Sequence, residues 1–405
     1  MSAVGTRSVL IDRIGELTTN GPDAPVRDAA IVLADGVVAW AGPSGRAPAA
    51  DERFDADGRA VLPGWVDAHT HLVFGGDRTR EFEARMAGEP YEAGGIAVTV
   101  AATRAASDEE LAANLVRLVR EAQHGGTTTL ETKTGYGLTV DDELRAARIA
   151  ARHVDAVTFL GAHVVPPDAD PDAYLDLVCG PMLDAVAPHV SAVDVFCERG
   201  AFDEAASRRI LSAGREAGLG LHVHGNQLGP GPGVRLAVEY GARSVDHAGF
   251  LDEDDLDALA RSWDDGRRGT VATVLPACDL STRMPLAPAR ALLDAGVPVA
   301  IATNCNPGTS YTTSMAFAVA TAVLQMRLSV AEAVRAATLG GAIALGMDVD
   351  GWVDPRGHAQ PRVGTLTVGA RADVQLLDAP SATHLAYRPG VPLTAAVWRA
   401  GERIV

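Results

Sequence analysis

The stretch WVDAHTH, residues 65–71, is a short apolar strand that ends in two histidines. Helical patterns follow it, such as SDEELAANLVRLVREAQH (107–124), in which Ser107 is a candidate N-cap and Glu110 stands three residues on. Seven further short apolar segments come later in the chain: TTTLET (127–132), VTFLGAH (157–163), AVDVF (192–196), LGLHVH (219–224), RSVDH (243–247), TVATVLP (270–276) and VPVAIAT (297–303). Eight such strands, mostly separated by helices, predict an α/β fold of the (β/α)8, TIM-like kind.

Both ends of the chain have a different pattern, in which short strands are separated by Gly and Pro. The amino-terminal segments are SVLIDRI (8–14), AAIVLADG (29–36), VVAWAG (37–42) and RAVLPG (59–64). The carboxy-terminal segments are GTLTVGARADVQLLDA (364–379) and AAVWRAGERIV (395–405). We therefore expect a small β-sandwich domain assembled from residues 1–61 and 361–405, next to a barrel of residues 62–360.

The bulk composition is that of an ordinary soluble globular protein, with 405 residues, 47% hydrophobic and 21% charged. A net charge of -17 disfavours nucleic acid and anionic membranes as partners. The four cysteines form no Cys-x-x-Cys pair, and we find neither a signal peptide nor an apolar run of the roughly 18 residues that span a bilayer. We expect a cytoplasmic protein, with a homodimer as the default oligomeric state.

Polar side chains stand at or next to the ends of six of the predicted barrel strands. Active sites of such barrels lie at the carboxyl ends of the strands, so residues spread over most of the chain should meet at one mouth. These polar residues are His69, His71, Glu131, Lys133, His163, His224, His247 and Asn304.

Histidines i and i+2 of one strand face the same side, so His69 and His71 can hold one cation between them. His224, at the end of the fifth strand, is the candidate third ligand. His222 lies one layer deeper on that strand, where a hydrogen-bonded core histidine is the more common arrangement. The sequence therefore predicts a metal site with His69, His71 and His224.

Several longer motifs resemble those of the imidazolonepropionase family, within the amidohydrolase superfamily. They follow one another in that family's order and cover nearly the whole barrel: DAHTHLVFGGDR (67–78), ETKTGYGL (131–138), TFLGAH (158–163), HGNQL (224–228), VDH (245–247) and NPGTS (306–310). GTLTVGARADV (364–374) resembles the superfamily's small sheet domain. The histidine pair alone indicates only an amidohydrolase, whereas GGDR, KTGYG and NPGTS together indicate this one family.

The resemblance implies hydrolytic ring opening of 4-imidazolone-5-propanoate to N-formimidoyl-L-glutamate, a step of histidine degradation. It also implies one Zn²⁺ or Fe³⁺ per subunit, which supplies an activated water. The ligands would be His69, His71, His224 and the residue at position 304, and His247 would accept or pass the proton of the water.

Position 304 departs from the family, which usually has aspartate there. Asn304 can still coordinate through its amide oxygen, but it is neutral and cannot take a proton. Three interpretations remain open: His247 suffices as the base, the chain is slow or inactive, or the residue is an engineered change that traps a complex.

The substrate that the resemblance implies has an anionic arm, and the resemblance assigns Arg78 as its bidentate anchor. Gln227 follows His224 by three residues and is expected to contact a ring nitrogen, which also makes it a candidate catalytic residue. The other expected substrate contacts are Tyr91, Tyr136, His163, Asn306, Gly308 and Thr309.

Lys133 is the only lysine among the 35 basic residues, which suggests that arginine would not serve there. Lys133 and Glu131 lie at the same mouth. A structural or electrostatic role is favoured over a carbamylated lysine that bridges two metals.

Two other functions compete with the hydrolase. A deaminase of the same superfamily typically has glutamate where this chain has Gln227, and Arg78 favours an anionic substrate instead. A ligand-binding homologue could have lost turnover through Asn304.

Overall fold

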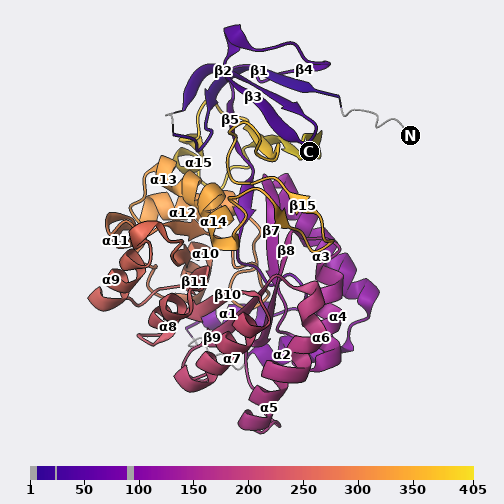
Figure 1. The fold of residues 1–405 in the computed structure, drawn as a ribbon, viewed down its shortest axis with the longest axis vertical. Helices are drawn as coiled ribbons and strands as arrows, with labels where there is room; N and C mark the ends of the chain where they lie inside the picture. The colour runs from indigo at the N-terminus through magenta and orange to yellow at the C-terminus, as the bar shows by residue number, and fades with distance from the viewer. Residues whose placement is uncertain (1–6, 23–24, 89–94) are drawn as a thin grey trace.

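The barrel predicted from the sequence is present in the computed structural model, which describes residues 7–22, 25–88 and 95–405. Eight parallel strands pair in chain order, each with the next, and form the lower part of the molecule in Figure 1. The strands are β6 (Trp65–Asp67), β7 (Thr127–Lys133), β8 (Ala156–Ala162), β9 (Ala192–Cys197), β10 (Gly220–Gly225), β11 (Ser244–His247), β12 (Val271–Val274) and β13 (Val299–Ile301). Each of the eight predicted segments overlaps one of these strands, and no strand extends more than one residue beyond its segment.

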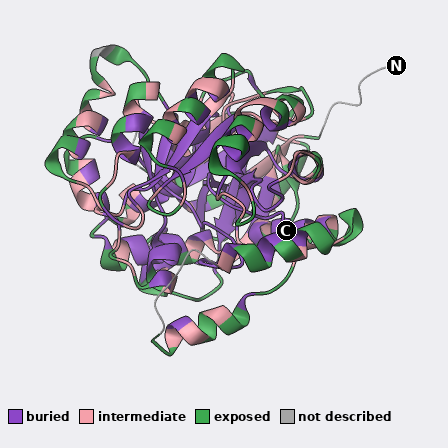
Figure 2. Cartoon of the chain, turned by 90° about the horizontal axis from the view of Figure 1, so that it is seen from below, coloured by how far each residue is buried: buried purple, intermediate pink, exposed green. Residues whose placement is uncertain are grey.

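Helices surround the barrel with their apolar sides inward, so the buried strands lie at the centre and the exposed surface on the helices (Figure 2). The last of the three α-helices described between β6 and β7, α3 (Asp108–His124), begins at a capping box between Ser107 and Glu110, as predicted. Other barrel helices are α1 (Thr79–Met86), α2 (Ile96–Ala105), α4 (Val140–Ala150), α5 (Pro171–Leu177), α6 (Leu183–Val186), α7 (Glu204–Glu216), α8 (Gly233–Tyr240), α9 (Glu253–Arg261), α10 (Pro276–Thr282), α11 (Ala289–Asp294), α12 (Met315–Gln325), α13 (Val330–Arg335) and α14 (Gly341–Leu345).

The first and last barrel strands meet through a few contacts at the mouth. Asp67 accepts hydrogen bonds from the backbone and hydroxyl of Thr303, at 3.0 and 2.6 Å. Just beyond, the Asn304 amide donates to His69 O at 3.0 Å, and the His71 amide donates to Cys305 O at 2.9 Å. The two segments that carry the candidate metal ligands are therefore fixed to each other.

Strands from both chain ends form one continuous sheet, at the top of Figure 1. Its order is β18-β17-β16-β5-β1-β2-β3, with β4 paired to β1, and it encloses an apolar core of its own. The strands are β1 (Val9–Leu17), β2 (Val26–Ala34), β3 (Val37–Pro43), β4 (Glu52–Asp55), β5 (Ala60–Pro63), β16 (Val374–Leu377), β17 (Thr394–Arg399) and β18 (Glu402–Arg403).

Strand pairing in the carboxy-terminal part is shorter than the sequence suggested, because residues 364–373 are bends, a turn and irregular backbone with one isolated bridge, from Arg371 to Val37. The side chain of Arg362 donates to Val368 O at 2.6 Å, which holds this segment in a turn. A short pair, β14 (Trp352–Val353) and β15 (Ala359–Gln360), and the helix α15 (His384–Tyr387) complete the region. The domain boundaries near residues 61 and 361 stay a prediction.

The terminal sheet packs against the beginning of the barrel strands. Arg371 is buried there, and it forms ion pairs with Asp155 at 3.1 Å and with Asp373 at 2.6 Å. Arg399 donates to Thr128 O at 2.9 Å. Since these contacts lie where β7 and β8 begin, the carboxyl ends of the strands remain free to form a site.

Candidate metal centre and active site

Three histidines meet at the carboxyl ends of the barrel strands. One nitrogen from each of His69, His71 and His224 lies within 4.8 Å of the other two. The ring centroid of His69 is 5.2 Å from that of His71 and 4.5 Å from that of His224. All three rings are buried, and burial holds the pKa of His69 and of His71 well below the usual value, so these two rings are neutral. Neutral imidazoles at this spacing are able to hold a metal ion.

Buried atoms in this cluster support that fit. His69 Nε2, His71 Nδ1 and Asn304 Oδ1 are buried and have no hydrogen-bond partner among the described residues. Such orphaned polar atoms are costly inside a protein unless a ligand satisfies them. Imidazole nitrogens and an amide oxygen suit Zn or Fe, so the donor set is compatible with the metal that the sequence implied.

Asn304 follows β13 in a left-handed backbone conformation, with φ at 52°. Asparagine tolerates this region better than most residues do. Its backbone carbonyl oxygen accepts a hydrogen bond from Asn306 Nδ2 at 2.6 Å, and its backbone amide donates to His69 O. The backbone of Asn304 is therefore fixed on both sides, while its amide oxygen Oδ1 stays available.

His247 ends β11 and lies on the other side of the histidine cluster, 5.4 Å from His224 between ring centroids. Its φ of 77° is also left-handed, which turns its side chain toward the mouth. Burial holds the pKa of His247 well below the usual value, so the ring is neutral, and its buried Nδ1 has no hydrogen-bond partner among the described residues. One ring nitrogen of His247 lies within 4.8 Å of ligand atoms of Cys278 and Asp279, two buried residues that the sequence reasoning did not select.

A small cavity opens directly above these histidines. Of the predicted site residues, it brings together His71, Arg78, Tyr136, His163, His224, Gln227, His247, Asn304, Asn306 and Thr309. Ile96 and Phe196 also line it and were not predicted. Gly308 lies in the adjoining groove, which shares Arg78, and Tyr91 lies outside the described residues.

Arg78 reaches the edge of the cavity with its guanidinium already engaged. Its Nε donates to Glu81 at 2.7 Å, and Arg85 Nη1 lies 3.8 Å from the same carboxylate. Two buried arginines thus share one acid, which leaves an excess of positive charge beside the cavity. A Cβ at Gly308 would lie 2.2 Å from Arg78 Nη1, so glycine there leaves the space that the guanidinium occupies.

Tyr136 and His163 form the opposite wall. Their ring centroids are 5.3 Å apart, and His163 stacks on His71 with 20° between the ring planes. His163 Nδ1 lies 3.0 Å from Gly135 O, and burial lowers the pKa of His163 to about 4. Buried Glu143 holds the loop that carries Tyr136, because its carboxylate accepts the backbone amides of residues 135, 137 and 138 at 2.8–2.9 Å.

The turn after Asn304 is shaped by Asn306. Its side-chain oxygen accepts the amides of Gly308 at 2.9 Å and Thr309 at 2.8 Å. Much of the Asn306 side chain is therefore used within the turn, although the residue lines the cavity.

A group of buried charges lies behind the histidines. Lys133 Nζ is 2.9 Å from Asp194, 3.2 Å from Glu131 and 3.7 Å from Asp246. Burial would lower the pKa of Lys133, but these carboxylates outweigh it and hold that pKa above the usual value. Contact with three carboxylates suits an ammonium group, in line with the electrostatic role that we favoured over carbamylation.

His222 lies apart from the three histidines, as expected for a core residue. Its Nδ1 is 2.8 Å from Ser244 Oγ, and burial lowers its pKa to about 3.

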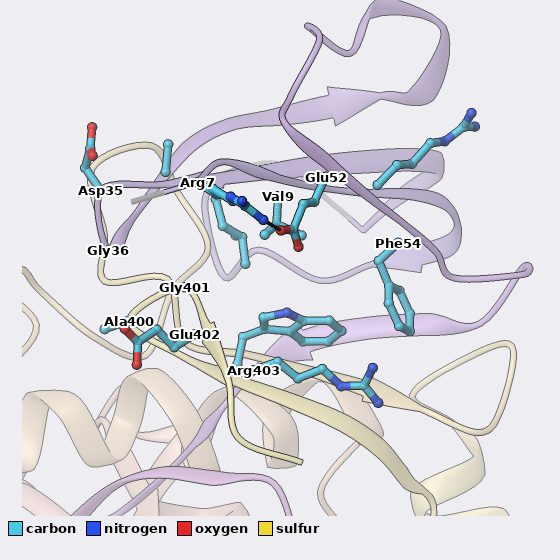
Figure 3. Close-up of a pocket in the computed structure, with 14 residues that line it drawn as sticks. Arg7, Val9, Asp35, Gly36, Glu52, Phe54, Ala400, Gly401, Glu402 and Arg403 are labelled. Atoms are coloured by element: carbon cyan, nitrogen blue, oxygen red, sulfur yellow. Dashed lines mark hydrogen bonds and ion pairs between the residues drawn. The ribbon is translucent and has the colours of Figure 1, made fainter. Parts of the chain in front are cut away.

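A larger cavity, of about 480 Å³, lies in the terminal sheet (Figure 3). Arg403 stacks there over Phe54 and Trp398, and Arg7 pairs with Glu52 at 3.2 Å. The Arg7–Glu52 pair is solvent-exposed, and no histidine or cysteine is among the residues that line this cavity. The functional site is therefore identified by its chemistry rather than by its size.

Among the described residues, no helix is long and apolar enough to cross a membrane.

The chain belongs to the amidohydrolase family, whose model matches residues 60–403. Curated relatives are more specific: the chain is 64% identical to the imidazolonepropionase of Paenarthrobacter aurescens strain TC1, with 100% of both chains covered. It is 66% identical to the imidazolonepropionase of Saccharopolyspora erythraea, with 98% of this chain and 99% of the relative covered.

Solved structures at lower identity share the fold. An adenosine deaminase from Xanthomonas campestris with bound zinc has a TM-score of 0.70 at 22% identity, covering 98% of this chain and 92% of the other. A triazine hydrolase from Arthrobacter aurescens has a TM-score of 0.72 at 19% identity, covering 99% and 95%. Since these proteins act on different molecules, the fold alone does not select a substrate.

Proposed function

We propose that this chain is an imidazolonepropionase, which hydrolyses 4-imidazolone-5-propanoate to N-formimidoyl-L-glutamate in the degradation of histidine. The observation that carries the proposal is that three histidines able to hold a metal ion meet the buried Arg78 at one cavity. Such a cavity suits a small cyclic amide with an anionic arm. The relatives named above, at 64–66% identity over nearly their whole length, support the same activity.

In this reaction water adds to the ring carbonyl carbon, and the bond from that carbon to the ring nitrogen breaks. His69, His71, His224 and Asn304 would hold the metal ion, which when bound polarises the carbonyl and lowers the pKa of the water. Both Zn²⁺ and Fe³⁺ accept three imidazoles and an oxygen, so we propose one ion of either kind per subunit.

The protein's own groups bind the substrate and move the proton. His247, neutral through burial, takes the proton of the attacking water and returns it to the leaving ring nitrogen. Gln227 and His163 contact ring atoms, Tyr136 packs against the ring, and Arg78 binds the propionate. Asn306, Gly308 and Thr309 shape the wall beside it, and we retain Tyr91 as a proposed contact.

The test is a ring-opening assay on the purified protein together with a metal analysis. The proposal requires turnover of the imidazolone that depends on bound metal. If metal-loaded protein is inert toward it but releases ammonia from a cyclic amidine or free base, the deaminase alternative is correct. The net charge of -17 supports a small-molecule substrate rather than nucleic acid or membrane, and we propose a cytoplasmic homodimer.

Arg78→Ala should raise KM for the propionate substrate by about 10- to 150-fold, the worth of a charge-assisted hydrogen bond. Turnover at saturation should change little, because Arg78 contacts the arm and not the reacting carbonyl. Arg78→Lys should cause a smaller rise in KM, since lysine keeps the positive charge but cannot make the bidentate hydrogen bonds of a guanidinium. Steady-state kinetics on the three proteins measures this.

Gly308→Ala provides an independent check of the anchor, because its methyl group would displace the Arg78 guanidinium without removing it. It should raise KM in the same direction. An unchanged KM in both Arg78→Ala and Gly308→Ala would remove Arg78 from the substrate site.

Asn304→Asp should increase metal affinity, because a carboxylate adds a negative ligand at a position whose backbone is already fixed. Turnover per bound metal should rise more than about tenfold only if the present chain lacks an efficient proton acceptor, since general-base help is typically worth 10²–10⁴-fold. Metal content and kcat for both forms separate the cases. A fast Asn304 form that aspartate leaves unchanged would exclude the impaired homologue.

A further inference from the structure

Lys133 is linked to two histidines of the metal cluster through carboxylates that contact both the lysine and the histidines. It ends β7 and is fully buried, and the carboxylates around it come from β7, β9 and β11. Two of these carboxylates extend further, to the histidines. Asp246 Oδ2 lies 2.6 Å from His69 Nδ1, and Asp194 Oδ2 lies 3.1 Å from His224 Nδ1.

These contacts fix the way the rings face. A carboxylate at Nδ1 leaves Nε2 as the free nitrogen of the ring, and His69 Nε2 has no partner among the described residues. Outer contacts of this kind orient metal-binding histidines and raise their basicity. Asp246 therefore orients the His69 ring, and Asp194 restrains His224 through the Nδ1 contact and by accepting the backbone amide of His224 at 3.2 Å.

The aspartates in turn need a cation between them. Glu131, Asp194 and Asp246 place three carboxylates in one buried cluster against a single ammonium, a formal excess of two negative charges. A divalent ion among neutral ligands would offset this excess. Without the ammonium, the carboxylates would repel one another and would have to move or take up protons.

The choice of lysine fits this geometry. An ammonium is a compact charge with three donors, and it can turn toward carboxylates on three strands. A guanidinium is planar, and its donors are arranged to bind one carboxylate in a bidentate way. Lys133 is the only lysine in a chain whose 34 other basic residues are all arginine.

We propose that Lys133 is a positioning residue of the metal centre, which joins Asp194 and Asp246 so that these carboxylates hold His224 and His69 toward one metal point. The inference rests on the metal site of the proposed function. It concerns how tightly the site binds metal and is independent of which ring the enzyme opens.

The test compares Lys133→Met with a matched variant, Arg371→Met. Arg371 is also a buried cation between two carboxylates, but it lies at the beginning of the barrel strands. The dissociation constant for Zn²⁺ is measured by chelator competition on metal-free protein, and the melting temperature of the metal-free form is measured beside it. Both variants should lower the melting temperature.

Only Lys133→Met should weaken metal binding, by about 10- to 100-fold, as expected when an outer contact to a ligand is lost. Arg371→Met should keep the wild-type dissociation constant. With metal saturating, KM of the Lys133 variant should stay near wild type, because the Arg78 side of the cavity is untouched. Equal metal affinity in the two variants and the wild type would overturn the proposal and leave Lys133 a structural residue.

A double variant, Glu131→Gln with Lys133→Met, distinguishes the positioning role of Lys133 from its effect on the net charge of the cluster. It also replaces the single variant if that variant does not fold. It keeps the formal charge of the cluster and both aspartates, but it removes the ammonium that contacts Asp194 and Asp246. Zn²⁺ binding should remain at least about tenfold weaker than wild type. Recovery of wild-type affinity would show that Lys133 acts through net charge alone and would overturn the positioning role. If wild-type protein binds Zn²⁺ but opens no imidazolone, the proposed function fails while this comparison stands.

Discussion

His71→Ala is expected to leave the protein folded, without stoichiometric metal and without measurable ring-opening activity. His71 supplies one of three imidazoles that lie within 4.8 Å of one another, and two neutral imidazoles with a neutral amide hold a divalent ion poorly. Loss of the ion returns the pKa of water from about 7 to 15.7, so turnover at neutral pH should fall by more than about 10⁴-fold. Metal analysis of the dialysed protein and kcat on the same sample measure both losses.

His222→Gln is the matched control for this result. His222 is also a buried barrel histidine, but it bonds to Ser244 and lies outside the cluster. This variant should keep its metal and most of its turnover. Stoichiometric metal together with full activity in His71→Ala would show that the ligand set is wrong.

The second large effect is expected for His247→Asn, in which kcat should fall by about 10²–10⁴-fold, the usual worth of a general base. Asparagine is the suitable substitution because His247 has φ at 77°, a conformation that asparagine accepts more readily than alanine. Metal content and KM should remain near wild type, since His247 is not among the three clustered ligands.

Combining His247→Asn with Asn304→Asp tests where the proton goes. If His247 is the acceptor, a carboxylate at position 304 should recover part of the lost turnover. A His247→Asn protein with unchanged kcat at full metal occupancy would move the base elsewhere, and buried Asp279, whose pKa burial raises to about 7, would be examined next.

The barrel could be predicted because each strand is a short apolar run with helical periodicity between most of them. The mouth could be predicted because parallel strands all deliver their carboxyl ends to one side, so that His69, His224 and His247 had to approach one another. Of the segment 364–379, in which short strands were expected, only β16 (Val374–Leu377) is a strand of the sheet, since Arg362 binds Val368 O and residues 367–370 bend.

What the sequence did not reveal is which buried charges contact one another across strands. Asp194 and Asp246 lie within apolar strands. The local sequence does not show whether such an aspartate contacts a metal-binding histidine or is only a buried charge in the core. The register between β9 and β10 sets the approach of Asp194 to His224, and the closing of the barrel brings Asp246 to His69, and only the structure provides both. A charged residue in the middle of an otherwise apolar strand was the available signal.

The Arg78–Glu81 pair could not be predicted for another reason. The i,i+3 spacing alone does not say which face of α1 the pair occupies.

The burial of Lys133 has a practical consequence for handling the protein. Because it is the only lysine, the surface of the folded molecule offers no side-chain amine to acylating, methylating or aldehyde reagents. Such reagents should leave Lys133 unmodified in the native state and modify it only when the barrel opens. The extent of Lys133 labelling, followed by mass spectrometry, would therefore report directly on how often the barrel unfolds.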